Sequence, residues 1–150
     1  LNDVAIAVQA ELLPVLDGLN AVLPVDPSAP ARPGSSEDVA SWRSAVDGAV
    51  ATFGDPPSAS TGVNLARNGL LLSVELLGSA VTAYESSLAA AGAERAVLED
   101  LAADLRMQAV DAWGVAATHL DVLNIDAGHG HVHIYLPARP GEEMEAPHGH

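Results

Sequence analysis

The sequence predicts an all-α protein, an antiparallel four-helix bundle built on a long helical hairpin over about residues 61–123. Apolar residues recur at steps of three and four in four separate segments, which is the period of a helix with one buried face. Hydrophobic residues make up 49% of the 150-residue chain but aromatic residues only 3%, so the core must consist mainly of leucine, valine and alanine. Alanine and leucine are strong helix formers, and this length fits a single domain with its own core.

The first predicted helix spans about residues 3–23, where Val4, Val8, Leu12 and Leu19 follow the helical spacing. Pro14 lies inside this segment. A proline in a helix interior removes a backbone hydrogen bond and clashes with the carbonyl four residues earlier. We therefore expect this helix to be kinked or broken at Pro14.

A proline-rich linker is predicted at about residues 24–36. Its prolines recur at every third residue, which is the repeat of polyproline II: Pro24, Pro27, Pro30 and Pro33. In a regular segment of this kind the four rings lie along one edge. We interpret the linker as a stiff spacer between helices; the alternative is that its prolines contact an aromatic groove of a partner protein.

The second predicted helix covers about residues 37–53 and is capped by Ser35 or Ser36. The two long helices of the hairpin follow at about 61–90 and 93–123, and the chain turns between them at Gly92. The first of these two is apolar around so much of its middle that we expect it to be buried on several sides. For the second, the spacing predicts an inner face made of Leu98, Leu101, Leu105, Ala109, Ala112, Ala116, Leu120 and Leu123.

The period of the apolar pattern changes after Asn124. In the stretch "HVHIYL", apolar and polar residues alternate, which is typical of a β-strand. We therefore divide the chain into a helical bundle, residues 1–123, and a C-terminal region, residues 124–150, that holds this strand and a tail rich in acidic residues, proline, glycine and histidine. A single strand cannot satisfy its own backbone, and the sequence offers no second strand. We expect the strand to lie on loops or to pair with another copy or another protein, so that the interface residues are Val132, Ile134, Tyr135 and Leu136 together with the linker prolines.

The histidines of the same region raise a second hypothesis. His129, His131 and His133 share one face of an extended segment, and imidazole is a good ligand for Zn, Cu or Ni. Because a zinc site needs three or four protein ligands, such a site would draw further ligands from a second chain or from His119, Asp126, His148 and His150. In the simpler interpretation the histidines are the solvated face of the strand, and no cofactor is required.

The charge of the chain argues against several partners. Six arginines, no lysine and 20 acidic residues give a formal net charge of −14, which repels nucleic acids and anionic membrane surfaces. The absence of cysteine excludes disulfides and thiolate metal sites. No apolar run of about 18 residues is present and the first residues lack a basic region, so we expect neither membrane insertion nor a signal peptide.

These observations favour a non-enzymatic structural or interaction subunit of a homo-oligomer or larger assembly. A virion or other particle component of bacterial or phage origin is an analogy from architecture, and a mature secreted protein is equally compatible. The partners would be further copies of the chain or other proteins of the assembly. Two alternatives stay open: a protein that binds Zn, Cu or Ni, and a helical bundle that binds a small ligand. An enzyme is disfavoured because the predicted helices contain no Glu-x-x-His pair and G-x-S-x-G does not occur.

Overall fold

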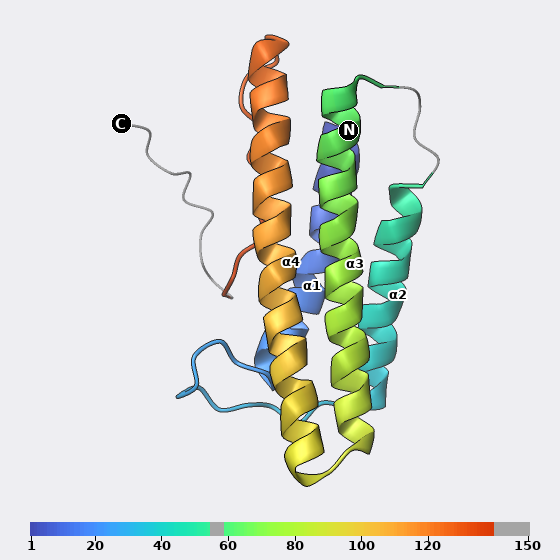
Figure 1. The fold of residues 1–150 in the computed structure, drawn as a ribbon, viewed down its shortest axis with the longest axis vertical. Helices are drawn as coiled ribbons and strands as arrows, with labels where there is room; N and C mark the ends of the chain where they lie inside the picture. The colour runs from blue at the N-terminus through green and yellow to red at the C-terminus, as the bar shows by residue number, and fades with distance from the viewer. Residues whose placement is uncertain (55–58, 140–150) are drawn as a thin grey trace.

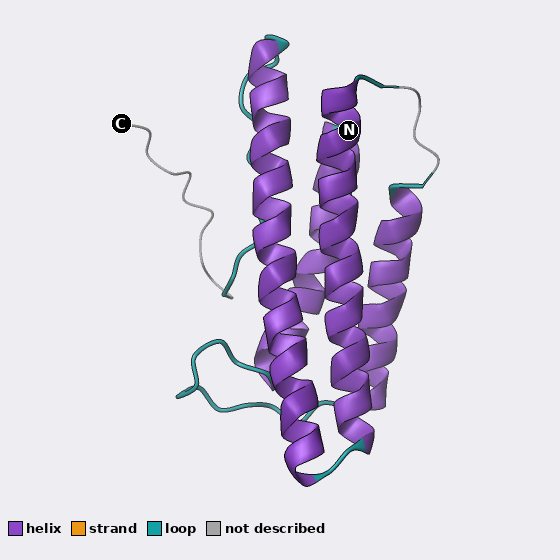
Figure 2. Cartoon of the chain, in the orientation of Figure 1, coloured by secondary structure: helices purple, strands orange, loops and turns teal. Residues whose placement is uncertain are grey.

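Four helices and no strand occur in the part of the chain that the computed structural model describes, residues 1–54 and 59–139 (Figure 2). They are α1 (Asn2–Val22), α2 (Ser36–Thr52), α3 (Thr61–Ala89) and α4 (Gly92–Asp126). The helices run alternately up and down, with α3 and α4 side by side, α2 beside α3, and α1 behind them (Figure 1). The all-α class and the helical bundle with its long hairpin are therefore confirmed.

Local hydrogen bonds explain where α2 begins. Ser35 is its N-cap: the Ser35 hydroxyl accepts a bond from the Asp38 N–H at 3.1 Å, and the Asp38 carboxylate accepts one from the Ser35 N–H at 2.9 Å. Arg32 donates to both carboxylate oxygens of Asp38, at 3.0 and 3.2 Å. The bonds from Arg32, followed by those from Ser35, lower the pKa of Asp38 to about 2. The cap predicted at Ser35 or Ser36 is thus Ser35.

Helix α1 continues through Pro14 from Asn2 to Val22 without interruption, so the expected break does not occur. The kink remains a prediction. The buried face of α1 includes Val8, Leu12, Val15 and Leu19, all at most 1% exposed. Packing of this face compensates for the backbone hydrogen bond that the proline ring removes, since tertiary contacts supply most of the stability of a helix.

Residues 23–35 connect α1 to α2 at the position of the predicted linker. A turn interrupts the regular polyproline repeat, since the Ala29 N–H donates to the Asp26 carbonyl at 3.0 Å. The Arg32 N–H donates to the Ala21 carbonyl at 2.7 Å, and this bond holds the loop against the end of α1. Pro27, Pro30 and Pro33 are exposed and Pro24 is partly buried. Contact of these prolines with a partner protein stays a prediction.

Glycine at position 18 allows α1 and α2 to approach closely. A Cβ added to Gly18 would lie 2.4 Å from Nε1 and 2.6 Å from two carbons of the Trp42 indole. The indole is 6% exposed and cannot move without repacking the core. We expect Gly18→Ala to lower the free energy of unfolding by about 1–3 kcal/mol despite the better helix propensity of alanine.

Gly114 provides the matched control for that substitution. It also lies inside a helix, α4, but a Cβ there would meet nothing within 4 Å. We expect Gly114→Ala to raise the free energy of unfolding by about 0.5–1 kcal/mol. Urea titrations followed by circular dichroism measure both values, and equal stabilisation by the two substitutions would refute the close contact of α1 and α2.

Helix α3 packs against α4, α2 and α1, as expected for a helix buried on several sides, but one side of it is open. Leu70, Val74 and Leu77 are fully buried, but Leu65 is 61% exposed and Leu72 is 51% exposed. Among the described residues, α1 and α2 cover only the inner side of the hairpin (Figure 1). The apolar character of α3 therefore extends beyond the core of this chain.

Among the described helices, α1 has the length and apolar composition that a membrane-spanning helix needs. The core helix of a bundle meets the same criteria, and the apolar face of α1 is buried against the other helices. This finding qualifies the expectation that the chain does not insert into a membrane, because that expectation depended on the lack of a long uninterrupted apolar run.

Candidate functional site

The C-terminal segment, residues 129–139, is extended but forms no strand, which corrects the β-strand prediction. It runs back along α4 (Figure 1), and side chains instead of a second strand bond the backbone of Val132, Ile134 and Tyr135. The Trp113 indole N–H donates to the Ile134 carbonyl, and Gln9 Nε2 donates to the Tyr135 carbonyl at 2.7 Å. The segment therefore joins α4 to α1 within the same chain.

The alternation read from the sequence nevertheless describes which side chains face the bundle. Ile134 is 2% exposed and Leu136 is 6% exposed, and both belong to the hydrophobic core. Val132 and Tyr135 are partly buried against that core. The apolar side of the described segment, residues 129–139, thus packs on its own bundle, and the division of the chain into two regions stays a prediction.

Asp121 of α4 fixes the start of this segment. Its Oδ1 accepts a bond from the Val132 N–H at 2.6 Å, and its Oδ2 lies 3.0 Å from His131 Nδ1. These two bonds, the backbone bond first, lower the pKa of the Asp121 carboxyl below its usual value. The carboxylate is consequently the form that holds the segment on α4.

The histidines of the segment share a face but do not converge. The His131 and His133 rings are stacked, with centroids 5.6 Å apart and planes 7° from parallel, and the Tyr135 ring lies beside them at 6.4 Å from His133. His129 lies apart, near the start of α1, among Leu1, Asn2 and Asp3. His131 and His133 are exposed. The Nδ1 atom of His131 faces the Asp121 carboxylate and not the other imidazoles.

The other candidate ligands lie elsewhere. His119 lies on a different side of α4 from Asp121, because two residues correspond to about half a helical turn. Asp126 is exposed at the end of α4. Within residues 1–54 and 59–139, no three His, Asp or Glu side chains are grouped so that they could hold one metal ion. His148 and His150 lie outside the described residues.

The open side of the α3–α4 hairpin is the largest feature that the sequence did not predict. Leu98, Leu101 and Leu105 were expected on the inner face of α4, but Leu101 is 46% exposed and the other two are only partly buried. The inner face contains Trp113, Ala109 and Leu120, as well as Ala102, Arg106, Ala116, Ala117 and Asn124. The three leucines therefore line the outer side of the bundle.

An apolar strip occupies the part of this outer side near the C-terminal end of α4. It surrounds a hollow of about 390 Å³ between α3 and α4. The hollow is lined by Leu65, Ala66, Gly69, Leu72, Ala112, Val115, Ala116 and His119. Val115 is 74% exposed, and Val122, two turns later on the same side of α4, is 50% exposed. His119 is the only polar side chain of this lining, and its Nε2 has no hydrogen-bond partner among the described residues.

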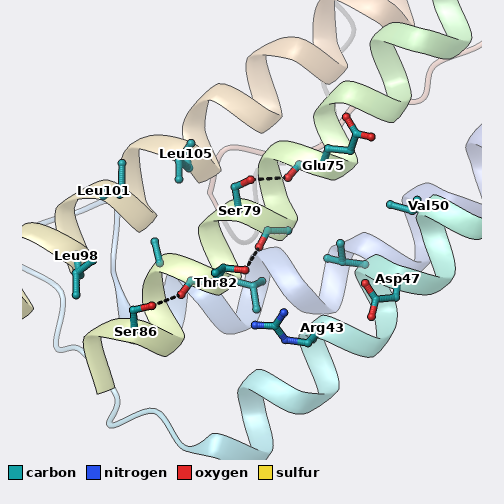
Figure 3. Close-up of a pocket in the computed structure, with 14 residues that line it drawn as sticks. Arg43, Asp47, Val50, Glu75, Ser79, Thr82, Ser86, Leu98, Leu101 and Leu105 are labelled. Atoms are coloured by element: carbon teal, nitrogen blue, oxygen red, sulfur yellow. Dashed lines mark hydrogen bonds between the residues drawn. The ribbon is translucent and has the colours of Figure 1, made fainter. Parts of the chain in front are cut away.

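A groove of about 600 Å³ lies toward the α3–α4 turn, with α3 as its floor and α2 and α4 as its walls (Figure 3). The three leucines from α4 point into it, opposite Val50 from α2, and Val46 of α2 also lines it. On its floor the hydroxyls of Ser79, Thr82 and Ser86 each donate to a carbonyl of their own helix at 3.0 Å. The floor is therefore polar but already hydrogen-bonded.

Carboxylates border this groove. Asp47 of α2 and Glu75 of α3 line it and are exposed, and no described residue forms an ion pair with either. Arg43 also lines the groove, but it is bound to Glu85. Asp104 is exposed on α4 next to Leu105. The groove thus combines an apolar wall with uncompensated negative charge.

The fold and these surfaces define the class of the protein: an all-helical bundle whose long hairpin has an open outer side. No protein family model, curated protein or solved structure matches the chain.

Proposed function

We propose that the protein is a non-enzymatic subunit that associates with further copies of itself through the apolar strip. The observation that carries this proposal is the exposure of four large aliphatic side chains on adjacent helices: Leu65 (61%), Leu72 (51%), Val115 (74%) and Val122 (50%). Contiguous exposed apolar side chains on a folded protein mark interaction sites. An uncharged centre is the typical composition of a protein–protein interface.

The shape of the strip supports a second copy as the occupant. Small residues, Gly69 with Ala112 and Ala116, form the middle of the hollow, and Leu65, Leu72 and Val115 stand at its rim. A surface that carries both protruding and recessed parts can pack against a copy of itself around a two-fold axis. The aliphatic side chains of one copy would then enter the hollow of the other.

The net charge of −14 opposes self-association. The lining of the hollow in the strip contains no acidic residue. Exposed carboxylates border the strip about one helical turn away, Glu75 beside Leu72 and Asp111 beside Val115, so salt that screens them should favour association.

This proposal moves the subunit contact away from the C-terminal segment, where the sequence placed it. Ile134 and Leu136 are buried in their own bundle and do not need another chain. The metal-binding and small-ligand alternatives receive no further support, since the histidines do not converge and the groove is open along α3.

Substitution of a single exposed valine tests the proposal. We expect Val115→Asp to raise the dissociation constant of the oligomer by at least about tenfold, because it removes an apolar contact and buries a carboxylate without a partner. The matched control is Val97→Asp, which changes the same helix by the same charge at a valine 66% exposed but outside the strip.

Size-exclusion chromatography with light scattering measures both variants across a range of concentrations. Circular dichroism should show unchanged helicity, since both valines are exposed. An oligomer that survives Val115→Asp, or one that Val97→Asp disrupts equally, would contradict the proposal.

A further inference from the structure

We propose that the groove between α2 and α4 binds an amphipathic helix of a partner protein whose flanks carry lysine or arginine. This inference does not depend on self-association through the apolar strip, which lies nearer the other end of the hairpin. It rests on three properties of the groove: the spacing of its leucines, its length, and the charge around it.

The spacing of the leucines matches a helical partner. Leu98, Leu101 and Leu105 follow one another at steps of three and four on α4. Residues at this spacing form the seam between two packed helices. Leu101 is 46% exposed although it lies in the middle of this seam, so the described chain leaves the position for a facing helix open (Figure 3).

The length and floor of the groove also suit a helix. From Glu75 to Ser86 the floor extends over about 16 Å at about 1.5 Å per residue, which corresponds to about three helical turns of an occupant. Gly78 in the middle of the floor has no side chain, and Val46 of α2 packs there: a Cβ on Gly78 would lie 3.0 Å from Val46 Cγ1. The hydroxyls of the floor are bonded to α3 itself and demand no donor or acceptor from the occupant.

The charge around the groove determines the kind of helix. Asp47 and Glu75 line it and Asp104 lies beside it, so any partner faces negative charge on more than one wall. The chain has no lysine, and each of its six arginines already has a partner within the chain. Arg32 binds Asp38, Arg43 binds Glu85, Arg67 binds Asn64, Arg95 binds Glu99, Arg106 binds the Leu23 carbonyl, and Arg139 is also engaged. The neutralising cations must come from the partner.

A second copy of this chain is a poor occupant of the groove for the same reason. It would bring a further net charge of −14. Because each of its arginines is already engaged, it offers no arginine to the unpaired carboxylates of the groove. A helix with leucines on one face and lysines or arginines beside them complements both the apolar wall and the carboxylates.

Designed peptides provide the probe. The first is a labelled three-heptad peptide with leucine at the first and fourth positions of each heptad and lysine and alanine elsewhere. The second replaces lysine with glutamate, and the third has the composition of the first in scrambled order. We expect the first peptide to bind the full chain saturably, with one peptide per chain, at least about tenfold more tightly than either of the others in fluorescence anisotropy.

Two pairs of variants locate the binding site. Asp47→Asn with Glu75→Gln should weaken binding of the first peptide about three- to tenfold. The charge-matched control, Asp3→Asn with Asp126→Asn, changes two exposed carboxylates away from the groove and should leave binding unchanged. Leu101→Asn should weaken binding about tenfold, whereas Ile125→Asn, at a residue of α4 with nearly the same exposure (44%), should not.

The outcomes separate this inference from the proposed self-association. Equal binding of the scrambled peptide, equal weakening by both charge-changing pairs, or tight binding of the glutamate peptide would each overturn the inference. Val115→Asp should bind the first peptide as the unsubstituted chain does. If Val115→Asp abolishes peptide binding while the groove variants do not, the peptide occupies the apolar strip and the groove is not its site.

Discussion

Replacing Trp113 with alanine is expected to lower the free energy of unfolding by about 3–5 kcal/mol, the range for removing a large aromatic side chain from a core. Trp113 has no solvent exposure, and its indole N–H donates to the Ile134 carbonyl. The substitution therefore leaves a large cavity beside α4 and removes one of the bonds that hold the C-terminal segment there. Because single domains are stable by about 5–15 kcal/mol, this single change should remove a large share of the total.

Trp113→Phe separates the two contributions and keeps the test informative if the alanine variant fails to fold. Phenylalanine retains much of the buried volume but cannot donate to the Ile134 carbonyl, so a loss of about 1–3 kcal/mol is expected. Urea unfolding followed by circular dichroism measures both variants, and Trp42 remains as a fluorescent reporter. A loss below about 1 kcal/mol for Trp113→Ala would mean that position 113 is not part of the core.

Replacing Ile134 with alanine should lower the free energy of unfolding by about 2–5 kcal/mol. Ile134 is 2% exposed although it lies outside the helices, so its burial depends entirely on docking of the C-terminal segment. An undocked segment would leave Ile134 in solvent, where the same substitution changes stability by less than about 0.5 kcal/mol.

His133→Ala is the control for Ile134→Ala. His133 is the preceding residue but points away from the core, where it stacks between His131 and Tyr135. Its replacement should change the free energy of unfolding by less than about 0.5 kcal/mol. Similar losses at both positions, or none at either, would contradict the docked arrangement.

The helices were predictable because local signals agree with packing. Each apolar stripe has helical spacing, Ser35 supplies a side-chain cap, and Gly92, with a φ of 57°, turns the chain into α4. Pro14 was the exception. Its local preference favours a break, but the buried face of α1 on both sides of the proline outweighs that preference.

The partner of the C-terminal segment was not predictable from the sequence. The alternation of Val132, Ile134 and Leu136 with polar residues was recognised, but alternation indicates only that one side is covered. The groups that cover it, Gln9 and Trp113, are 126 and 21 residues away from their backbone acceptors along the chain. A side chain that replaces a strand partner produces no periodic signal.

The sequence pattern does not reveal the open outer side of the hairpin, for a related reason. Leu98, Leu101 and Leu105 were assigned to the inner face because they have the spacing of a buried seam. The same spacing continues along α4 through Ala112, Val115, His119 and Val122. This continuation is the signal in the sequence that indicates an outer apolar side. Spacing identifies a face that packs, but it does not distinguish packing within the chain from packing on another molecule.

The measurement that tests the central claim most directly is sedimentation equilibrium of the unsubstituted chain at about 0.05 M and about 0.5 M salt. An apolar interface between two strongly acidic subunits predicts a discrete oligomer whose dissociation constant falls as salt rises, because the Debye length shrinks from over 10 Å to less than about 5 Å. A monomer at both salt concentrations, or an oligomer that weakens as salt rises, would contradict self-association through the apolar strip.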